Sequence, residues 1–351
     1  MARLTRDVSP GALAAFDALI DVRSPAEFAE DHLPGAINLP VLDDTQRAEV
    51  GTLYVQKSKF EARRLGAAMV ARNIATHLDG ALSDQPGGFR PLVYCWRGGQ
   101  RSGAMVSVMD QVGWPVTQLE GGYQTWRRHV VARLHDPAQA PRVILLDGPT
   151  GAGKTALLAA LSAHGVQTLD LEGLANHRGS LFGAGAQPQP AQKLFESRLT
   201  AALADCDPDR PVVVEAESSR IGRLVIPQGL WAAMKAAPAI TLDVPFAARV
   251  RRTVDEYTDI ARDLPRLQAA IAALPAHHSR EARGAWLAQA SAGEITDLAE
   301  SLIRDHYDPA YRRSTARSPR ASLGHIRWDG REPTMNAAAG AVARMIGGQA
   351  G

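Results

Sequence analysis

A cysteine followed by a loop rich in glycine and arginine is the first feature of this sequence that could perform chemistry. The apolar run Leu92–Tyr94 is typical of a short buried strand, and Cys95 follows it directly. The predicted loop consists of Trp96, Arg97, Gly98, Gly99, Gln100 and Arg101. The segment Ser102–Val108 is typical of a helix. A loop that curls from strand to helix directs its backbone N–H groups inward, so we expect an anion-binding nest that lowers the pKa of the Cys95 thiol.

The cysteine loop by itself is compatible with two chemistries. Arg97 and Arg101 add positive potential, which favours a thiolate or a chalcogen anion at Cys95. The spacing Cys95-x5-Arg101 is also that of the phosphate-binding loop of cysteine phosphatases. The other cysteine, Cys206, has no basic or glycine-rich surroundings, and we expect it to be structural.

A second strand–loop–helix pattern indicates a phosphate-binding loop. The segment Arg142–Asp147 is predicted to be a buried strand, and Gly148–Thr155 fits the pattern G-x-x-x-x-G-K-[ST]. The residues expected to bind a diphosphate are Gly148, Gly151, Ala152, Gly153, Lys154 and Thr155. In such a loop the backbone N–H groups surround the phosphates, Lys154 reaches the terminal phosphate and Thr155 contacts a magnesium ion.

Two carboxylates follow a further apolar run and are candidates for an acid or a metal ligand. The run ends in Glu215 and Glu217, which would share one face if the strand continued through both. In a P-loop domain, the end of a second strand places an acidic side chain near the metal ion or near a water molecule, and this run has the position of such a strand. The sequence does not decide between the two residues, and a solvated strand end is the alternative.

Arginine clusters in the second half suggest phosphate or RNA contacts. Residues 301–331 contain seven arginines and three aspartates, interleaved with aromatic residues, a mixture that suits single-stranded RNA. The candidate RNA contacts are Arg312, Arg313, Arg317 and Arg320. Arg249–Arg252 could contact phosphates or form a solvated helix face. His277-His278 has no third partner at metal-ligand spacing in the sequence, so we predict no metal site there.

The elements that would position these residues belong to a two-domain α/β protein. The chain has 351 residues, of which 45% are apolar and 22% charged, with a net charge of +2. Strands that alternate with helices predict parallel sheets in both halves. We expect a first domain over 1–135, a linker over 136–141, a P-loop domain with a helical, basic C-terminal region over 142–336, and a tail over 337–351. No long apolar run and only two cysteines favour a cytoplasmic protein without membrane contact or disulfides.

The first half resembles rhodanese domains. The resemblance rests on Asp21–Phe28, His32–Asn38, the Cys95 loop and Gly121-Gly122-Tyr123-x-x-Trp126, which occur in the order seen in that family. It covers about residues 5–135 and implies a rhodanese-like sheet. It also implies that the cysteine carries sulfur or selenium as a persulfide or perselenide anion.

Nearly the whole chain is similar to the bacterial tRNA 2-selenouridine synthases. The segments that carry this resemblance are Cys95–Gly99, Leu171–Gly183, Gln189–Glu196 and Glu217–Gly222. It implies that 2-thiouridine at the wobble position of tRNA is first S-geranylated with geranyl diphosphate. Selenium from selenophosphate then replaces the geranylthio group. The implied partner is the anticodon loop of Lys, Glu and Gln tRNAs.

The resemblance also implies roles for the residues singled out above. Cys95 is the chalcogen carrier, and its anion is stabilised by Arg97, Arg101 and the loop glycines. The P-loop holds geranyl diphosphate, with a magnesium ion at Thr155 and no tightly bound organic cofactor. The alternative is a cysteine phosphatase or sulfurtransferase fused to a P-loop kinase or ATPase, which predicts phosphate release from aryl phosphates or ATP turnover that survives Cys95→Ser.

Overall fold

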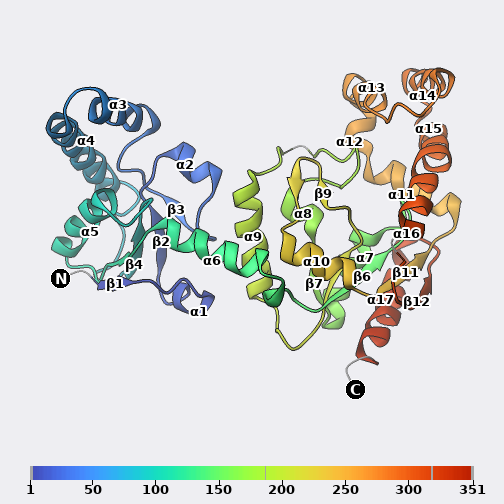
Figure 1. Cartoon of the computed structure of the whole chain (residues 1–351), viewed down its shortest axis with the longest axis horizontal. Helices are drawn as coiled ribbons and strands as arrows, with labels where there is room; N and C mark the ends of the chain where they lie inside the picture. Colours follow the sequence, from blue (N-terminus) through green and yellow to red (C-terminus); the bar gives the residue numbers. More distant parts are fainter. Residues whose placement is uncertain (1–2, 186, 318, 349–351) are drawn as a thin grey trace. The chain divides into compact units, whose positions relative to one another are not determined.

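The computed structural model describes residues 3–185, 187–317 and 319–348, and the chain divides into two compact units (Figure 1). The first unit comprises the chain up to Arg133 together with Ala191–Ala204. The second comprises Leu134–Pro190 and the chain from Asp205 onward. Each unit is built on its own five-stranded parallel sheet, so the predicted α/β class is confirmed.

The first unit is a parallel sheet in the order β1-β5-β4-β2-β3. Its strands are β1 (Arg3–Thr5), β2 (Ala18–Asp21), β3 (Ile37–Asn38), β4 (Pro91–Tyr94) and β5 (Thr117–Leu119). Its helices are α1 (Pro10–Leu13), α2 (Pro25–Glu30), α3 (Asp44–Gln56), α4 (Lys59–Asp79), α5 (Gln100–Val112), α6 (Tyr123–His135) and α9 (Gln192–Ala204). The central strand β4 is buried along its whole length, as expected for a parallel sheet covered on both faces.

Strand β4 is the element that carries the cysteine loop into the interior. It pairs with β2 on one side, where Ile20 lies opposite Val93, and with β5 on the other. The hydrophobic core around it includes Val93, Cys95, Met105 and Met109, so one face of α5 packs against the strand that precedes it. Burial of this apolar face fixes the start of α5 close to the end of β4.

The second unit is a parallel sheet in the order β12-β11-β6-β8-β7, with a separate antiparallel pair of β9 and β10. Its strands are β6 (Val143–Asp147), β7 (Gln167–Leu169), β8 (Val212–Glu215), β9 (Arg220–Ile221), β10 (Leu224–Val225), β11 (Ala239–Asp243) and β12 (Ser322–Arg327). Its helices in the first half are the 3-10 helix η1 (Pro137–Gln139), α7 (Lys154–Leu161), the 3-10 helix η2 (Ser162–His164), α8 (Leu171–Ala175) and α10 (Gln228–Ala236). The helices that follow are α11 (Phe246–Glu256), α12 (Thr258–Ala261), α13 (Leu264–Ala272), α14 (Arg280–Ala292), α15 (Ile295–Leu302), the π-helix η3 (Ile303–Tyr307), α16 (Asp308–Arg317) and α17 (Glu332–Gly347).

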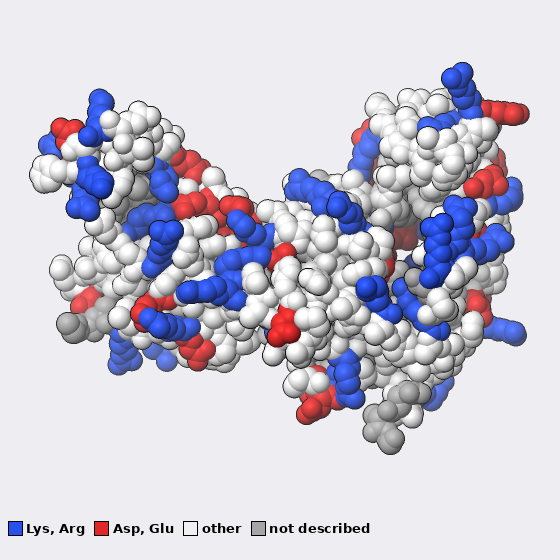
Figure 2. All heavy atoms as spheres, in the orientation of Figure 1, with Lys and Arg blue, Asp and Glu red and all other residues white. Residues whose placement is uncertain are grey.

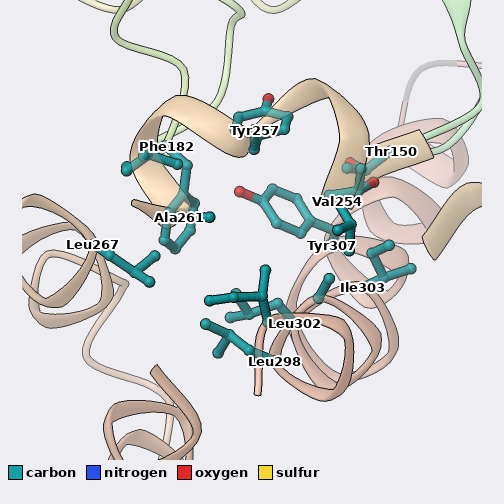
Figure 3. Close-up of a pocket in the computed structure, with 14 residues that line it drawn as sticks. Thr150, Phe182, Val254, Tyr257, Ala261, Leu267, Leu298, Leu302, Ile303 and Tyr307 are labelled. Atoms are coloured by element: carbon teal, nitrogen blue, oxygen red, sulfur yellow. The ribbon is translucent and has the colours of Figure 1, made fainter. Parts of the chain in front are cut away.

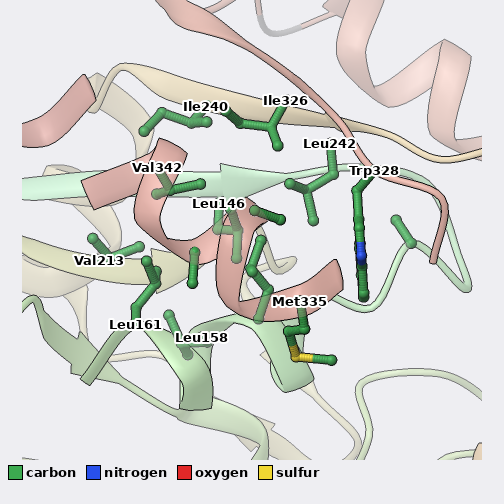
Figure 4. Packing of buried hydrophobic residues seen from close by; sticks show 14 of the residues in the cluster. Leu146, Leu158, Leu161, Val213, Ile240, Leu242, Ile326, Trp328, Met335 and Val342 are labelled. Carbon is green, nitrogen blue, oxygen red and sulfur yellow. The ribbon is translucent and has the colours of Figure 1, made fainter. Parts of the chain in front are cut away.

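Helix α17 belongs to the core of the second unit. Figure 4 shows Met335 and Val342 of this helix packed in one cluster with Leu158 of α7 and Leu146 of β6. The predicted boundary at residue 336 therefore falls inside a helix whose apolar face covers the sheet. The expected tail over 337–351, an alanine-rich helix in the sequence interpretation, is helical as far as residue 347, and its alanine-rich face packs closely against α7.

Helix α9 groups with the first unit, although the sequence places it inside the expected second domain. The Trp126 indole donates a hydrogen bond to the Ser197 hydroxyl at 2.9 Å, and Arg127 forms an ion pair with Glu196. Lys193 Nζ lies 2.7 Å from a carboxylate oxygen of Glu30. These polar contacts explain why the division of the chain is not the simple one between residues 135 and 142.

A helical layer completes the second unit. Its own core joins α12, α13, α14 and α15, with Ile271, Trp286 and Leu298 among the buried residues. Among the residues that the structure describes, no helix combines the length and the apolar character that crossing a membrane requires.

Candidate functional sites

The cysteine of the first unit lies at the carboxyl end of β4, at the start of the predicted nest. Its side chain is 3% exposed, and the Ser102 hydroxyl lies 3.2 Å from the sulfur. Burial by itself raises the pKa of the Cys95 thiol. Hydrogen bonds from the Ser102 side chain and from the backbone N–H groups of Ser102, Arg97 and Gly99 outweigh that effect, so the pKa lies below its ordinary value.

Two glycines allow the loop to close around the sulfur. A Cβ atom on Gly98, whose φ is +67°, would lie 2.7 Å from the carbonyl oxygen of Leu119. A Cβ atom on Gly122 would lie 2.2 Å from the carbonyl oxygen of Cys95. The Tyr123 N–H also donates to that carbonyl at 2.8 Å. The Gly121-Gly122-Tyr123 segment therefore packs against the cysteine loop. Only glycine at position 122 allows the two backbones to approach this closely.

The two loop arginines differ in their surroundings. Arg97 is exposed beside the nest. Arg101, in the first turn of α5, donates to a carboxylate oxygen of Glu27 at 2.6 Å and is only partly exposed. The ion pair occupies the guanidinium of Arg101, which connects the loop to α2. The pairing bears equally on both interpretations of the loop, because each of them assigns the Arg101 guanidinium to an anion at Cys95.

The remaining loop residues, Trp96, Gly99 and Gln100, connect Cys95 to the first turn of α5. Trp96 is half-buried, and its ring lies 5.2 Å from the ring of Tyr123. The Arg23 guanidinium lies 4.1 Å from the centre of the Tyr123 ring. Gln100 begins α5, and Gly99 stands at its N-cap. The N-terminus of this helix therefore faces the cysteine, as the sequence predicted.

The P-loop of the second unit connects β6 to α7, as the motif predicted. Lys154 begins α7, and its ammonium group donates to the carbonyl oxygen of Gly148 at 3.1 Å. Gly151 has φ +77°, and a Cβ atom there would lie 2.5 Å from the carbonyl oxygen of Arg249. Gly153 is left-handed at the N-cap of α7, while Gly148 begins the loop and Ala152 lies buried within it.

Arg249 holds the P-loop from behind. Its guanidinium, 6% exposed, donates to the carbonyl oxygen of Thr150 at 3.0 Å and to both carboxylate oxygens of Asp308 at 2.8 and 2.7 Å. Of the two interpretations that the sequence left open for the arginines of 249–252, the structure places Arg249 inside the fold and Arg251 and Arg252 on the wall of the cavity described next.

A cavity of about 1140 Å³ opens in front of the P-loop. Its basic lining residues are Lys154, Arg178, Arg251, Arg252 and Arg331, and its acidic ones include Glu172, Glu217 and Asp255. The lining has five basic and five acidic side chains, so the part of the cavity that is suited to an anion is the P-loop itself, where Lys154 and the loop N–H groups meet.

Three carboxylates meet beside Thr155. Oxygens of Glu172, Glu215 and Glu217 lie within 4.8 Å of one another, and the Thr155 hydroxyl donates to Glu172 at 3.2 Å. Strand β8 ends at Glu215, so Glu217 lies past the strand rather than on it, and both nevertheless reach the same place. The sequence did not single out Glu172, which lies in the first turn of α8 behind the capping residue Asp170.

The carboxylate cluster is short of positive charge. Burial first, and then the charges of Glu215 and Glu217, raise the pKa of Glu172 to about 9. Burial raises the pKa of Glu215 to about 7 and also raises that of Glu217. Among the described residues, neither oxygen of Glu215 has a hydrogen-bond partner. A divalent cation with oxygen ligands fits this set, because it would allow the carboxylates to ionise together.

An apolar cavity adjoins the P-loop cavity. It has a volume of about 60 Å³, and Thr150, Tyr257 and Tyr307 line both cavities. Figure 3 shows Tyr307 between Tyr257 and Leu302, with Phe182 and Leu267 on the wall. No sequence pattern predicted this cavity, because its walls come from the P-loop, from the loop after α8 and from the helices α11, α12, α13, α15 and η3.

The candidate RNA contacts fall into two groups. Arg312, Arg313 and Arg317 are exposed on α16, and Figure 2 shows Lys and Arg side chains gathered over the region of α11 and α16. Arg320 is 20% exposed and lies 3.7 Å from a carboxylate oxygen of Asp147 at the end of β6. Its side chain is therefore directed toward the sheet and not toward solvent.

The fold and the two sites define a rhodanese-like domain joined to a P-loop domain. A family model described as rhodanese-like domain matches residues 9–129, and one described as tRNA 2-selenouridine synthase AAA domain matches residues 141–279. This chain belongs to the tRNA 2-selenouridine synthase family.

Relatives with that name support the assignment along most of the chain. The protein from Cupriavidus pinatubonensis is 35% identical over 327 residues, which cover 84% of this chain and 87% of the relative. The protein from Nitrosomonas europaea is 36% identical over 248 residues, which cover 68% of this chain and 63% of the relative. Among solved structures, a rhodanese-related protein from Thermoplasma volcanium is 20% identical, covers 36% of this chain and 91% of its own, and has a TM-score of 0.24.

Proposed function

We propose that this protein converts 2-thiouridine in tRNA to 2-selenouridine in two steps, first geranylation and then selenation. Relatives that align with most of the chain are named tRNA 2-selenouridine synthases, which supports the RNA substrate and the product. The proposed position of the modification is the wobble uridine of Lys, Glu and Gln tRNAs. The proposed location of the protein is the cytoplasm. Exposed Arg312, Arg313 and Arg317 are the proposed contacts to the RNA backbone.

The P-loop cavity is the proposed site of the first step. The thiocarbonyl sulfur of the base attacks C1 of geranyl diphosphate, a C–S bond forms, the C–O bond breaks and diphosphate leaves. The proton on N3 of the base is lost to solvent. Lys154 and the loop N–H groups would stabilise the diphosphate as its charge increases. A magnesium ion held by Thr155, Glu172, Glu215 and Glu217 would neutralise further charge.

One observation supports geranyl diphosphate over a nucleotide, namely the apolar cavity that continues the anion-binding cavity. The diphosphate would lie on the P-loop, and the distal part of the prenyl chain would enter among Phe182, Leu298 and Leu302. The cavity is smaller than a whole ten-carbon chain, so the proximal part would pass Thr150, Tyr257 and Tyr307, which line both cavities. A polar nucleoside would gain nothing from these walls.

The Cys95 nest is the proposed site of the second step. Geranylation removes the negative charge from the sulfur, so that geranylthiolate can leave C2. Selenium takes its place: the C–Se bond forms and the C–S bond breaks. Selenophosphate supplies the selenium and water takes the phosphoryl group as phosphate, so no net oxidation or reduction occurs. Cys95 is the proposed nucleophile: its thiolate attacks the phosphorus of selenophosphate, the P–Se bond breaks, and the nest holds the selenide that is released and that attacks C2. Water then cleaves the S–P bond, which returns the thiol and releases phosphate.

A reconstitution with the purified chain tests the proposal. We expect thiolated anticodon stem-loop RNA, geranyl diphosphate, selenophosphate and Mg²⁺ to yield 2-selenouridine, measured by mass spectrometry of the nucleosides. Without selenophosphate, S-geranyl-2-thiouridine should accumulate. RNA that stays unmodified under both conditions would contradict the proposal. ATP hydrolysis that persists in Cys95→Ser, or release of phosphate from an aryl phosphate, would favour the kinase or phosphatase alternative.

A further inference from the structure

Three histidines from two separate segments meet in the helical layer of the second unit. His277 and His278 lie in the loop between α13 and α14, and His306 lies in the π-helix η3. Each offers a ring nitrogen within 4.8 Å of the others. Nε2 of His278 and Nδ1 of His306 are 2.9 Å apart. The third partner that the sequence around 277 and 278 did not supply therefore comes from 28 residues farther along the chain.

The loop that carries the first two histidines is held in a fixed shape. The Arg283 guanidinium donates to the carbonyl oxygens of Ala272, Leu274 and Pro275 at 3.3, 2.9 and 2.7 Å. The ring of Trp286, 2% exposed, meets the His278 ring edge-on at 5.0 Å. These contacts restrict the loop before any ligand binds, which lowers the entropy lost on binding.

The third histidine is presented by an irregular helix. His306 is 9% exposed, and η3 is a π-helix, a form that is rare and occurs frequently at functional sites. The wider turn sets the His306 ring 4.8 Å from the ring of Tyr307. Both residues line the P-loop cavity, so the histidine cluster adjoins that cavity.

The charged groups that act on the cluster, besides the histidines themselves, are Arg283, Arg313 and Asp305. Burial, then the neighbouring histidines and Arg313, lower the pKa of His306 to about 4. Burial and the charges of His277, Arg283 and Arg313 lower the pKa of His278, while Asp305 acts in the opposite direction. Arg283 is directed at carbonyl oxygens and not at the rings.

We propose that His277, His278 and His306 form a binding site for a divalent transition-metal ion of the Zn²⁺ type. A tetrahedral ion with Zn–N bonds of about 2.0–2.1 Å holds its nitrogens roughly 3.3 Å apart. Two of the three nitrogens already lie close to this separation, and the exposed His277 ring can move to complete the set. The metal replaces the proton shared by His278 and His306, and that proton moves to the other nitrogen of its ring.

The site has a defined place in the fold. Three protein ligands leave one position of a tetrahedral ion for water or an external ligand. The ion would connect the α13–α14 loop to η3 and so hold the wall of the P-loop cavity that His306 and Tyr307 form. This inference does not depend on the chemistry proposed for the P-loop.

Cobalt spectroscopy on the full chain tests the site. Metal-free protein is titrated with Co²⁺ in excess Mg²⁺, which occupies the carboxylate cluster beside Thr155. We expect visible absorption bands of tetrahedral intensity at one ion per chain, lost on addition of equimolar Zn²⁺. The variant His277→Ala should weaken Co²⁺ binding at least tenfold, and His306→Ala should do the same. Because His277 is exposed, its replacement is not expected to disturb folding.

The control is His325→Ala, which removes an exposed histidine outside the cluster. It should bind Co²⁺ as the parent chain does. Visible bands that are absent in the parent chain, or that persist unchanged in His277→Ala and His306→Ala, would overturn the proposal. Circular dichroism of each metal-free variant shows whether it is folded. Zn²⁺ should also raise the melting temperature of the parent chain and not that of His277→Ala.

Discussion

Individual side chains show how this protein sets opposite charge preferences at its sites. The Cys95 sulfur is surrounded by hydrogen-bond donors, which favour its anion despite burial. Burial disfavours the anion of Glu215 and outweighs the Thr155 hydroxyl and the Lys154 charge, which favour it. The first residue is prepared to act as a nucleophile or an anionic carrier, and the second to bind a cation. Burial is common to both, and the difference is that Cys95 has several hydrogen-bond donors whereas Glu215 has only one donor nearby and lies beside other carboxylates.

The hydroxyl of Ser102 should control the acidity of the cysteine. In Ser102→Ala the thiolate loses one hydrogen bond, so its pKa rises and a smaller fraction is ionised at any pH below that value. Alkylation by iodoacetamide near pH 6 should slow about tenfold, the equivalent of roughly 1.4 kcal/mol. The pH–rate profile of alkylation measures this, and its inflection should move to higher pH.

Ser107→Ala is the matched control for this measurement. Ser107 is exposed on the same helix, and its hydroxyl donates to the carbonyl oxygen of Gly103 at 2.8 Å. Its removal should leave the profile in place. If Ser102→Ala and Ser107→Ala gave the same inflection as the parent chain, the Ser102 hydroxyl would have no part in stabilising the thiolate.

At the scale of elements, the sequence predicted most of the structure that is formed by consecutive residues. Both strand–loop–helix units, β4 to α5 and β6 to α7, were predicted because an apolar run, a glycine-rich loop and a helical segment follow one another directly in the sequence. Glu172 and the partnership of His306 with His277 and His278 were not. These residues approach their partners only through tertiary packing. Their spacing along the chain gives no indication of that contact.

Helix α17 shows the same limit for a whole element. The sequence interpretation made residues 336–351 an alanine-rich helix that frays into glycines, and placed 337–351 outside the P-loop domain as a tail. In the structure the small side chains allow close approach to α7, and Ala339 is 0% exposed. Composition alone does not distinguish a buried alanine-rich helix from an exposed one, because alanine is common both in buried helix contacts and on surfaces.

A charge in the buried face of α17 should destabilise the second unit. Ala339→Glu places a carboxylate in a core without a partner, which should cost roughly 3 kcal/mol or more. The melting temperature of the second unit should fall by about 6–12 °C, since 1 kcal/mol corresponds to about 2–4 °C for a unit of this size. Differential scanning calorimetry gives the measurement. Ala337→Glu, on the exposed face, should leave the transition within a degree or two, and equal effects of the two variants would show that α17 does not pack as described.

The whole molecule combines two units, each with its own sheet and its own anion-binding loop. Both loops follow the carboxyl end of a central parallel strand, where helix N-termini and backbone N–H groups converge. The two loops differ in their side chains: one has a thiol, and the other a lysine with a carboxylate cluster. In the proposed function, such a chain would divide the replacement of sulfur by selenium at C2 of the base into two steps. One unit would activate the sulfur as a leaving group, and the other would supply the selenium.

That division predicts a crosswise pattern for variants of the two loops. Lys154→Ala should slow geranylation of thiolated RNA by roughly a hundredfold or more, because diphosphate loses its principal cation. The same variant, supplied with RNA that is already S-geranylated, should form 2-selenouridine at close to the parent rate. Cys95→Ser should behave in the opposite way, geranylating thiolated RNA normally and leaving the geranylated base unchanged when selenophosphate is added.

Nucleoside mass spectrometry after each incubation distinguishes these outcomes, with circular dichroism to show that both variants are folded. If Lys154→Ala failed on geranylated RNA as well, the P-loop would be required for selenation and the two sites would not be separate in function. If Cys95→Ser lost geranylation, the thiol would act before the chalcogen exchange. Either result would contradict the assignment of one step to each unit, whereas the crosswise pattern is what two loops with opposite charge preferences should produce.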